Sequence, residues 1–195
     1  MPPALAAVLA LTACTSGGSV STSSSSSAVS TSSSSSSSTT SSSPPPTSAS
    51  SSPTYVPVKP AFPAAAKPQT LDSAAAFVTY FFKLANYSFT KPEDGLLGPL
   101  GTSTCRACAN YEREAVNLVA KHRRYLSEVV TVDSVTVVTT SRDHPFVIVT
   151  GEQNEVPILE TDGRLTPAAP RLPINFRVQL QWTAQGWRVA GVANA

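Results

Sequence analysis

Two cysteines three residues apart, Cys105 and Cys108, are the sharpest chemical feature of this 195-residue chain. The C-x-x-C spacing is that of thiol oxidoreductases, in which a helix N-terminus lowers the pKa of the thiol. On the first turn of a helix the same spacing places the two Cα atoms about 5 Å apart, within disulfide range. We favour a structural disulfide that locks the helix start to the preceding loop, because no thioredoxin-like βαβ pattern surrounds the pair. A redox protein is the alternative.

The two histidines add no metal-binding pattern. A zinc site needs two ligands beyond Cys105 and Cys108 at suitable spacing, and His122 and His144 do not supply them. We therefore expect no metal and no cofactor. His122 lies in the basic run of residues 121–124, which predicts a solvated basic helix end, with a phosphate or anionic-lipid contact as the alternative.

A third cysteine, Cys14, ends a short apolar start and opens a tract made almost wholly of serine and threonine. Residues 1–13 have the length and the small final residues of a secretory signal, and are too short to span a bilayer. The layout resembles a bacterial lipoprotein signal, which implies that Cys14 is lipidated and becomes the new N-terminus. Each buried methylene contributes about 0.8 kcal/mol, so two acyl chains hold firmly. We expect an exported protein, lipid-anchored to the outer face of the cell membrane, with a soluble secreted protein as the alternative.

Residues 14–69 predict a disordered tether. From Thr15 to Thr54 the chain has no charged or aromatic residue, and its few apolar side chains cannot offset the entropy of ordering. Between Tyr55 and Gln69 several prolines favour extended backbone. As a flexible coil the arm spans about 40 Å. The serine-rich composition is also typical of O-glycosylated stalks, which is the alternative to an unmodified spacer.

Residues 70–195 hold one domain's worth of chain. Thr70 or Asp72 is expected to cap a helix that ends near residues 86–89, because apolar side chains recur at steps of three and four. A Pro/Gly break and a second helix over residues 104–124 follow. Acidic and basic residues balance in this domain, which argues against a nucleic-acid partner.

After residue 127 the hydrophobic period changes from helical to two-fold, and β-branched residues take over. Strands are expected over residues 128–139, 146–153, 174–183 and 187–192. A weaker hairpin is expected around Asp162-Gly163, a dipeptide typical of type I′ turns. Helices followed by an antiparallel meander predict an α+β fold in which a curved sheet closes on N-terminal helices.

This order of elements resembles the nuclear transport factor 2-like fold, also called the cystatin-like roll. Three short motifs are similar to those of uncharacterised lipoproteins of high-GC Gram-positive bacteria. They are Asn86-Tyr87, the run from Cys105 to Tyr111, and the closing residues 186–189, Gly-Trp-Arg-Val. The resemblance implies the fold and a place in the cell envelope, and it implies no activity.

Enzymes of the resembled fold place an Asp or His with tyrosines inside the cone of the roll, where burial raises the pKa of a carboxyl group. The nearest imitation in this chain is Asp133, with Tyr80, Tyr87 or Tyr111 facing it. Asp133 lies in a strand of alternating polar and apolar residues, and this pattern is equally consistent with an Asp133 side chain that faces water. A cone-type isomerase or hydratase is therefore kept as an alternative function.

We expect a binding domain rather than an enzyme. Its ligand would be a small apolar molecule in the cone or an envelope protein on the open face of the sheet. The residues expected to line a pocket are all aromatic: Tyr80, Phe81, Tyr87, Tyr111 and Trp182. Membrane contact is expected through the lipid on Cys14 alone.

Overall fold

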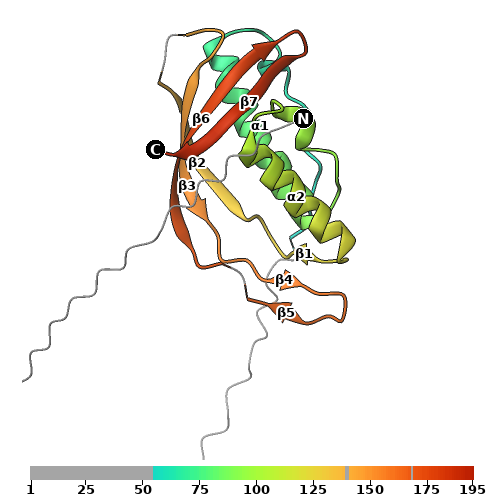
Figure 1. Cartoon of the computed structure of the whole chain (residues 1–195). Coiled ribbons are helices and arrows are strands. Elements are labelled where there is room, and N and C mark those ends of the chain that lie inside the picture. The colour runs from blue at the N-terminus through green and yellow to red at the C-terminus, as the bar shows by residue number, and fades with distance from the viewer. Residues whose placement is uncertain (1–54, 139–140, 168) are drawn as a thin grey trace, which may run out of the picture. The chain divides into compact units, whose positions relative to one another are not determined.

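The structure is a computed structural model of the chain, and it has the α+β architecture that the order of elements predicted (Figure 1). It describes residues 55–138, 141–167 and 169–195. Cys14, the expected signal peptide and the tether up to residue 54 lie outside the described residues.

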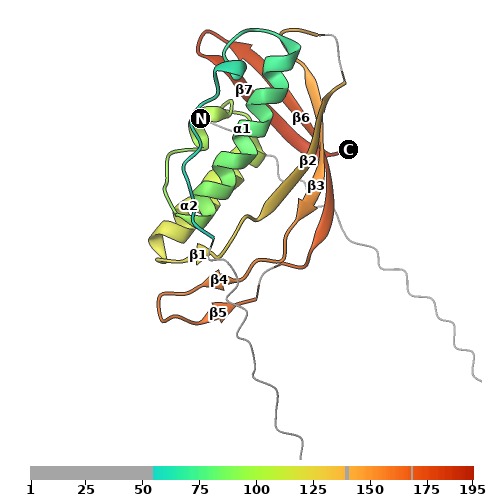
Figure 2. The same ribbon diagram turned by 180° about the vertical axis from the view of Figure 1, so that it is seen from behind.

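Two long helices and a four-stranded antiparallel sheet make up the cystatin-like roll. The helical segments are η1 (Ala64–Ala66), α1 (Leu71–Thr90), η2 (Gly98–Leu100) and α2 (Arg106–Ala120). The strands are β1 (Arg124–Tyr125), β2 (Val130–Val137), β3 (Phe146–Gln153), β4 (Ile158–Leu159), β5 (Leu165–Thr166), β6 (Leu172–Thr183) and β7 (Gly186–Asn194). The large sheet has the order β2-β3-β6-β7, and β1, β4 and β5 form a small separate sheet. Figure 1 and Figure 2 show both long helices on the same side of the large sheet.

The start of α1 is fixed by a reciprocal capping interaction, which confirms Thr70 as the cap. The Ser73 N–H donates to Thr70 Oγ1 at 3.2 Å, and the Thr70 N–H donates to Ser73 Oγ at 3.1 Å. The helix then continues to Thr90, slightly beyond the expected end. Every residue from Leu84 to Thr90 is buried, so the last two turns of α1 are covered on all sides.

One of those sides is covered by residues that the composition predicted to be tether. Residues 55–68, which we call the N-terminal strap, run along α1, and the Phe62 ring lies 6.4 Å from Phe77 and 5.0 Å from Tyr80. Lys59 forms an ion pair with Glu93 beyond the end of the helix. The folded unit therefore begins before Thr70, because the strap buries apolar surface of α1 that would otherwise face water.

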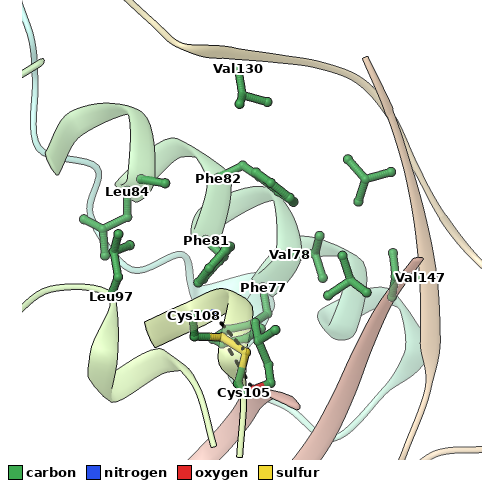
Figure 3. Packing of buried hydrophobic residues seen from close by; sticks show 14 of the residues in the cluster. Phe77, Val78, Phe81, Phe82, Leu84, Leu97, Cys105, Cys108, Val130 and Val147 are labelled. Carbon is green, nitrogen blue, oxygen red and sulfur yellow. Dashed lines mark hydrogen bonds between the residues drawn. A yellow bond between two sulfur atoms is a disulfide. The ribbon is translucent and has the colours of Figure 1, made fainter. Parts of the chain in front are cut away.

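The core lies between α1 and the sheet (Figure 3). Phe77, Val78, Phe81 and Phe82 of α1 are at most 1% exposed, and the alternating residues of β3 face them, including Val147. Burying one such side chain contributes about 1.5–3 kcal/mol. The buried face of α1 and the alternation of buried residues along β3 confirm the helical and two-residue periods seen in the sequence.

The edge strand β2 is held to α1 by one buried amide. Asn86 Oδ1 accepts from the N–H groups of Val129 and Val130 at 3.0 Å, and its Nδ2 donates to the Val130 carbonyl at 2.7 Å. Further along, the register of β2 shifts between Val132 and Ser134. The Asn86 amide thus supplies the hydrogen bonds that a neighbouring strand would supply to the beginning of β2. The register shift is a β-bulge, which bends the strand beyond it.

Two local predictions were wrong. The second helix ends at Ala120 rather than near residue 124, because the chain turns there into the short strand β1. At Asp162-Gly163 only the glycine has a positive φ, of 82°. A type I′ turn needs positive φ at both central residues, so the hairpin closes instead through a turn with a single left-handed glycine.

Replacing Asn86 by alanine should lower the free energy of unfolding by about 2–4 kcal/mol, because it leaves buried backbone groups of β2 without partners. Urea unfolding of the two proteins measures the difference. Asn117→Ala is the matched control, since Asn117 is exposed on α2, and it should change the stability by less than about 0.5 kcal/mol. Equal effects of the two substitutions would contradict the role given to Asn86.

Candidate functional site

The structure does not bring the five expected pocket residues together. Phe81 and Tyr87 are core residues, 0% and 5% exposed. Tyr80 lies under Phe62 of the strap, and Trp182 packs edge-on to Trp187 at the β6–β7 turn, with ring centroids 5.0 Å apart. The remaining residue, Tyr111, lies on α2.

Aromatic rings of the chain itself fill the space between the helices and the sheet. The Phe82 ring stacks on Phe176 of β6 at 6.2 Å, with an interplanar angle of 8°. Tyr111 meets the Phe81 ring edge-on at 5.7 Å. These contacts occupy the interior position in which a small apolar ligand was expected.

Tyr111 opens onto a surface hollow of about 350 Å³ that lies between α1 and α2. Its lining residues are Phe89, Ala107, Asn110, Tyr111 and Glu114, and we call it the aromatic hollow. The Tyr111 and Phe89 rings stack at 6.0 Å, and Phe89 also contacts the Tyr125 ring at 6.0 Å. The result is an aromatic floor with an amide and a carboxylate at its rim.

Two phenol groups at this site stay protonated at neutral pH. Burial raises the pKa of Tyr111 above its usual value. Burial also raises the pKa of Tyr125, and the Glu114 carboxylate adds to that rise because it repels the phenolate. Neutral phenols donate hydrogen bonds and do not act as bases.

The aromatic hollow was only partly visible in the sequence. Tyr111 was identified from its residue type, whereas Phe89 and Glu114 were missed. The signal was the spacing of Ala107, Asn110, Tyr111 and Glu114, which recur at steps of three and four and so share one face of a helix.

The carboxylate–tyrosine arrangement of a cone enzyme is not assembled. Asp133 is exposed at the bulge of β2 and lines a groove of about 380 Å³, together with Thr79 and Lys83 of α1. Tyr87 points elsewhere and donates to Glu93 at 3.2 Å. None of the three tyrosines expected opposite Asp133 lines this groove: Tyr80, Tyr87 and Tyr111.

Cys105 and Cys108 form the expected disulfide, with a Cα–Cα distance of 5.3 Å. Cys105 is the N-cap of α2, and its Sγ accepts from the Cys108 N–H at 3.2 Å. Both residues are at most 3% exposed and belong to the core cluster. Gly101 lies so close that a Cβ there would be 2.7 Å from Cys108 Cβ. Thiol exchange requires access to a sulfur atom, so this arrangement favours a structural bond.

The closing motif also holds the scaffold together. The Trp187 indole N–H contacts Ser73 Oγ at 2.9 Å and the Pro68 carbonyl at 3.3 Å. It therefore ties the β6–β7 hairpin to the N-terminus of α1 and to the strap. Asn86 and Trp187 therefore connect α1 to the sheet, whereas the disulfide closes the first turn of α2.

The described residues show neither a metal site nor a membrane span. In the ranges 55–138, 141–167 and 169–195, no group of three or more His, Cys, Asp or Glu side chains is placed to hold a metal ion. No helix in the same ranges is long and apolar enough to cross a bilayer.

Removing the disulfide should cost stability without changing the fold. The closed loop is very short, so replacing both cysteines by alanine should lower the free energy of unfolding by about 2 kcal/mol. Under native conditions the bond should resist mild dithiothreitol, because both sulfur atoms are buried. Thiol labelling followed by mass spectrometry checks this. Rapid reduction of the native protein would favour the redox alternative instead.

Comparisons with known proteins give distant structural likenesses. No curated protein matches the chain. The intermembrane space region of the chloroplast protein ARC6 is 16% identical, with a TM-score of 0.47, and the match covers 64% of this chain and 95% of that one. A Nostoc punctiforme protein of unknown function with a cystatin-like fold is 8% identical, with a TM-score of 0.38 and coverages of 63% and 89%.

A third similar structure is a putative calcium/calmodulin-dependent protein kinase II association domain from Xanthomonas campestris. It is 13% identical, with a TM-score of 0.31, and the match covers 69% of this chain and 90% of that one. The family comparison is more specific. A model described as a family of unknown function, DUF6318, matches residues 45–193, and the chain therefore belongs to this family.

Proposed function

We propose that this chain is a lipoprotein of the bacterial cell envelope whose roll is a non-enzymatic protein-binding domain. The lipid is carried by Cys14, and the Ser/Thr-rich segment up to residue 54 is the tether. The proposal is supported by the apolar start, by the small residues before Cys14 and by the uncharged tract after it. The tether would let the domain reach partners several nanometres from the membrane.

The observation that carries the binding role is the aromatic hollow. Aromatic side chains that remain partly exposed in a concave site are typical anchors in protein interfaces. Tyr111 is such a partly exposed ring, it stacks on Phe89, which is 5% exposed, and the polar groups of Asn110 and Glu114 border the hollow. Because the chain's own rings fill the space between α1 and the sheet, this surface hollow offers a place for an apolar contact.

A protein partner suits the hollow better than a small molecule does. Small-molecule sites usually enclose most of the ligand surface in a deep cavity. The aromatic hollow is open, and its lining continues onto the exposed surface of α2 through Asn110. We infer that a partner inserts one apolar side chain beside Tyr111, while polar groups around it contact the rim.

The anchor predicts a clear change in cell fractionation. Cells fed an alkynyl fatty acid should label the full chain, and detergent phase partition should place it with membrane proteins. Cys14→Ser should abolish the label and release the protein to the aqueous phase, because no acyl chain can form. The Cys105→Ala, Cys108→Ala double variant is the control and should keep its label. An unlabelled wild-type protein would refute the anchor.

The binding role predicts position-specific cross-linking. A photo-reactive phenylalanine analogue at Asn110, at the rim of the hollow, should give a discrete protein adduct in living cells. The same analogue at Asn117, exposed on α2 outside the hollow, should not. Ala107→Trp should fill the hollow and lower the adduct yield about tenfold, equivalent to about 1.4 kcal/mol.

Native mass spectrometry of the full chain separates the other outcomes. A co-purifying small molecule that Ala107→Trp displaces would assign the hollow to a ligand rather than to a protein. Equal adduct yields at Asn110 and Asn117 would remove the hollow from consideration as a binding site.

A further inference from the structure

The C-terminal end of α2 meets the β4–β5 hairpin and borders a second hollow, of about 460 Å³. Three consecutive residues, His122, Arg123 and Arg124, line it from one side, and Glu160 and Thr161 of the hairpin line it from the other. We call it the basic hollow. It brings the basic run noticed in the sequence into a concave site.

These basic side chains are not needed to cap the helix. The Arg123 N–H donates to the Leu118 carbonyl at 2.9 Å, and the His122 N–H donates to the Val119 carbonyl at 3.1 Å, which is the Schellman arrangement. Thr161 Oγ1 donates to the His122 carbonyl at 3.3 Å. The Leu118 and Val119 carbonyl groups of α2 are therefore satisfied by backbone N–H groups, and a hydroxyl of the hairpin binds the carbonyls just after the helix.

His122 occupies a position where glycine is favoured. Its φ is 50°, and it is the one non-glycine residue with positive φ among the residues that the structure describes. The left-handed conformation costs free energy for a residue with a Cβ. A histidine held there at such a cost points to a role for the imidazole, since strain of this kind gathers at functional sites.

Most hydrogen-bond donors at the basic hollow are unused. Arg123 Nη1 donates to Glu160 at 3.3 Å, and Glu160 also accepts a hydrogen bond from Thr166 at 2.7 Å. Arg123 Nε is buried and has no partner within the described part of the chain. In the same ranges no hydrogen bond or ion pair involves the side chain of His122 or Arg124. Such a set of unpaired donors can be satisfied by a ligand that carries several acceptor oxygens.

We propose that the basic hollow binds a phosphate group, held by the guanidinium groups of Arg123 and Arg124 and by the imidazole of His122. The planar fork of arginine matches the oxygen spacing of phosphate, and the hydrogen bonds are charge-assisted. The helix dipole opposes an anion at this end. The carbonyl groups that carry much of that dipole are already hydrogen-bonded, and they lie next to three basic side chains.

Which phosphate compound can reach the basic hollow depends on how the domain is attached to the membrane. Tyr55, the first described residue of the strap, lies beside Thr90 at the end of α1. Pro92, just beyond that end, lines the basic hollow. The chain thus enters the domain beside this site. If the lipid anchor of the proposed function holds, anionic lipid headgroups are within reach, and this choice of source rests on that proposal.

The test uses the full chain with Cys14→Ser, so that no lipid is attached. Inorganic phosphate is titrated at constant ionic strength, and the Arg123 Nε–H signal is followed by ¹⁵N-resolved nuclear magnetic resonance. We expect a saturable shift with phosphate and none with chloride. Absence of a saturable shift would overturn the proposal, whatever the outcome for the anchor or for the aromatic hollow.

Two substitutions separate binding from a structural role. Arg124→Gln should weaken phosphate binding about tenfold. His122→Gly should raise the urea midpoint, because it relieves the left-handed strain, and yet weaken phosphate binding. His144→Gly, in an exposed turn, is the control and should leave the phosphate affinity unchanged. A His122→Gly protein that is more stable and binds phosphate equally well would remove His122 from the site and overturn the proposal in this form.

Vesicles identify the source. Sedimentation with phosphatidylglycerol vesicles but not with phosphatidylcholine vesicles, lost in Arg124→Gln, would support a lipid headgroup. Phosphate binding without vesicle binding would support a soluble phosphate compound.

Discussion

The burial of α1 is the constraint on which the rest of this molecule depends. The helix carries a run of aromatic and aliphatic side chains that one face of a sheet cannot cover, so the sheet, α2 and the strap each bury a part of it. A helix covered in this way has polar ends that water cannot fully satisfy. Ser73 meets that need at the N-terminus through Thr70, and at the C-terminus Thr90 Oγ1 donates to the Asn86 carbonyl at 2.8 Å. The Asn86 side chain does the same for the edge of β2, which packs on this helix.

Aromatic side chains fill the space between the helices and the sheet, so the two proposed binding sites lie on the surface of the domain. Both hollows that carry a proposal involve α2, one beside its first turns and one at its end. Just before the helix begins, the Thr102 N–H donates to the Val189 carbonyl of β7 at 2.8 Å, and the disulfide closes the first turn. Just after the helix ends, Thr161 of the β4–β5 hairpin donates to the Lys121 carbonyl at 3.1 Å. A helix fixed at both ends presents its side chains with little freedom left to lose, which lowers the entropic cost of binding.

The two sites also differ in kind. The aromatic hollow offers apolar surface and neutral phenols, whereas the basic hollow offers cationic side chains, of which Arg123 is paired with Glu160 only through Nη1. A domain on a long tether could use both at once, because they occupy different parts of α2. Binding to a partner at one and to phosphate at the other would then gain from the high effective concentration that follows from linkage.

The sequence by itself determined the elements whose patterns are local. Steps of three and four, a capping threonine and two-residue alternation predicted α1, most of α2 and the long strands, because these signals act over a few residues. The cysteine pair and the basic run were equally legible. The strap was not, because proline-rich extended backbone looks the same in a disordered arm and in a segment packed on a helix.

Only the tertiary structure decided what depends on contacts distant in sequence. The packing of Phe62 on Tyr80 turned expected tether into domain. The bulge in β2 placed Asp133 in the groove beside α1, away from the tyrosines that a catalytic cone would need. Phe89 and Tyr111 became one surface because α1 and α2 pack together. Residue type and spacing fix what a side chain can do, but its neighbours depend on non-local packing, which no short window of sequence contains.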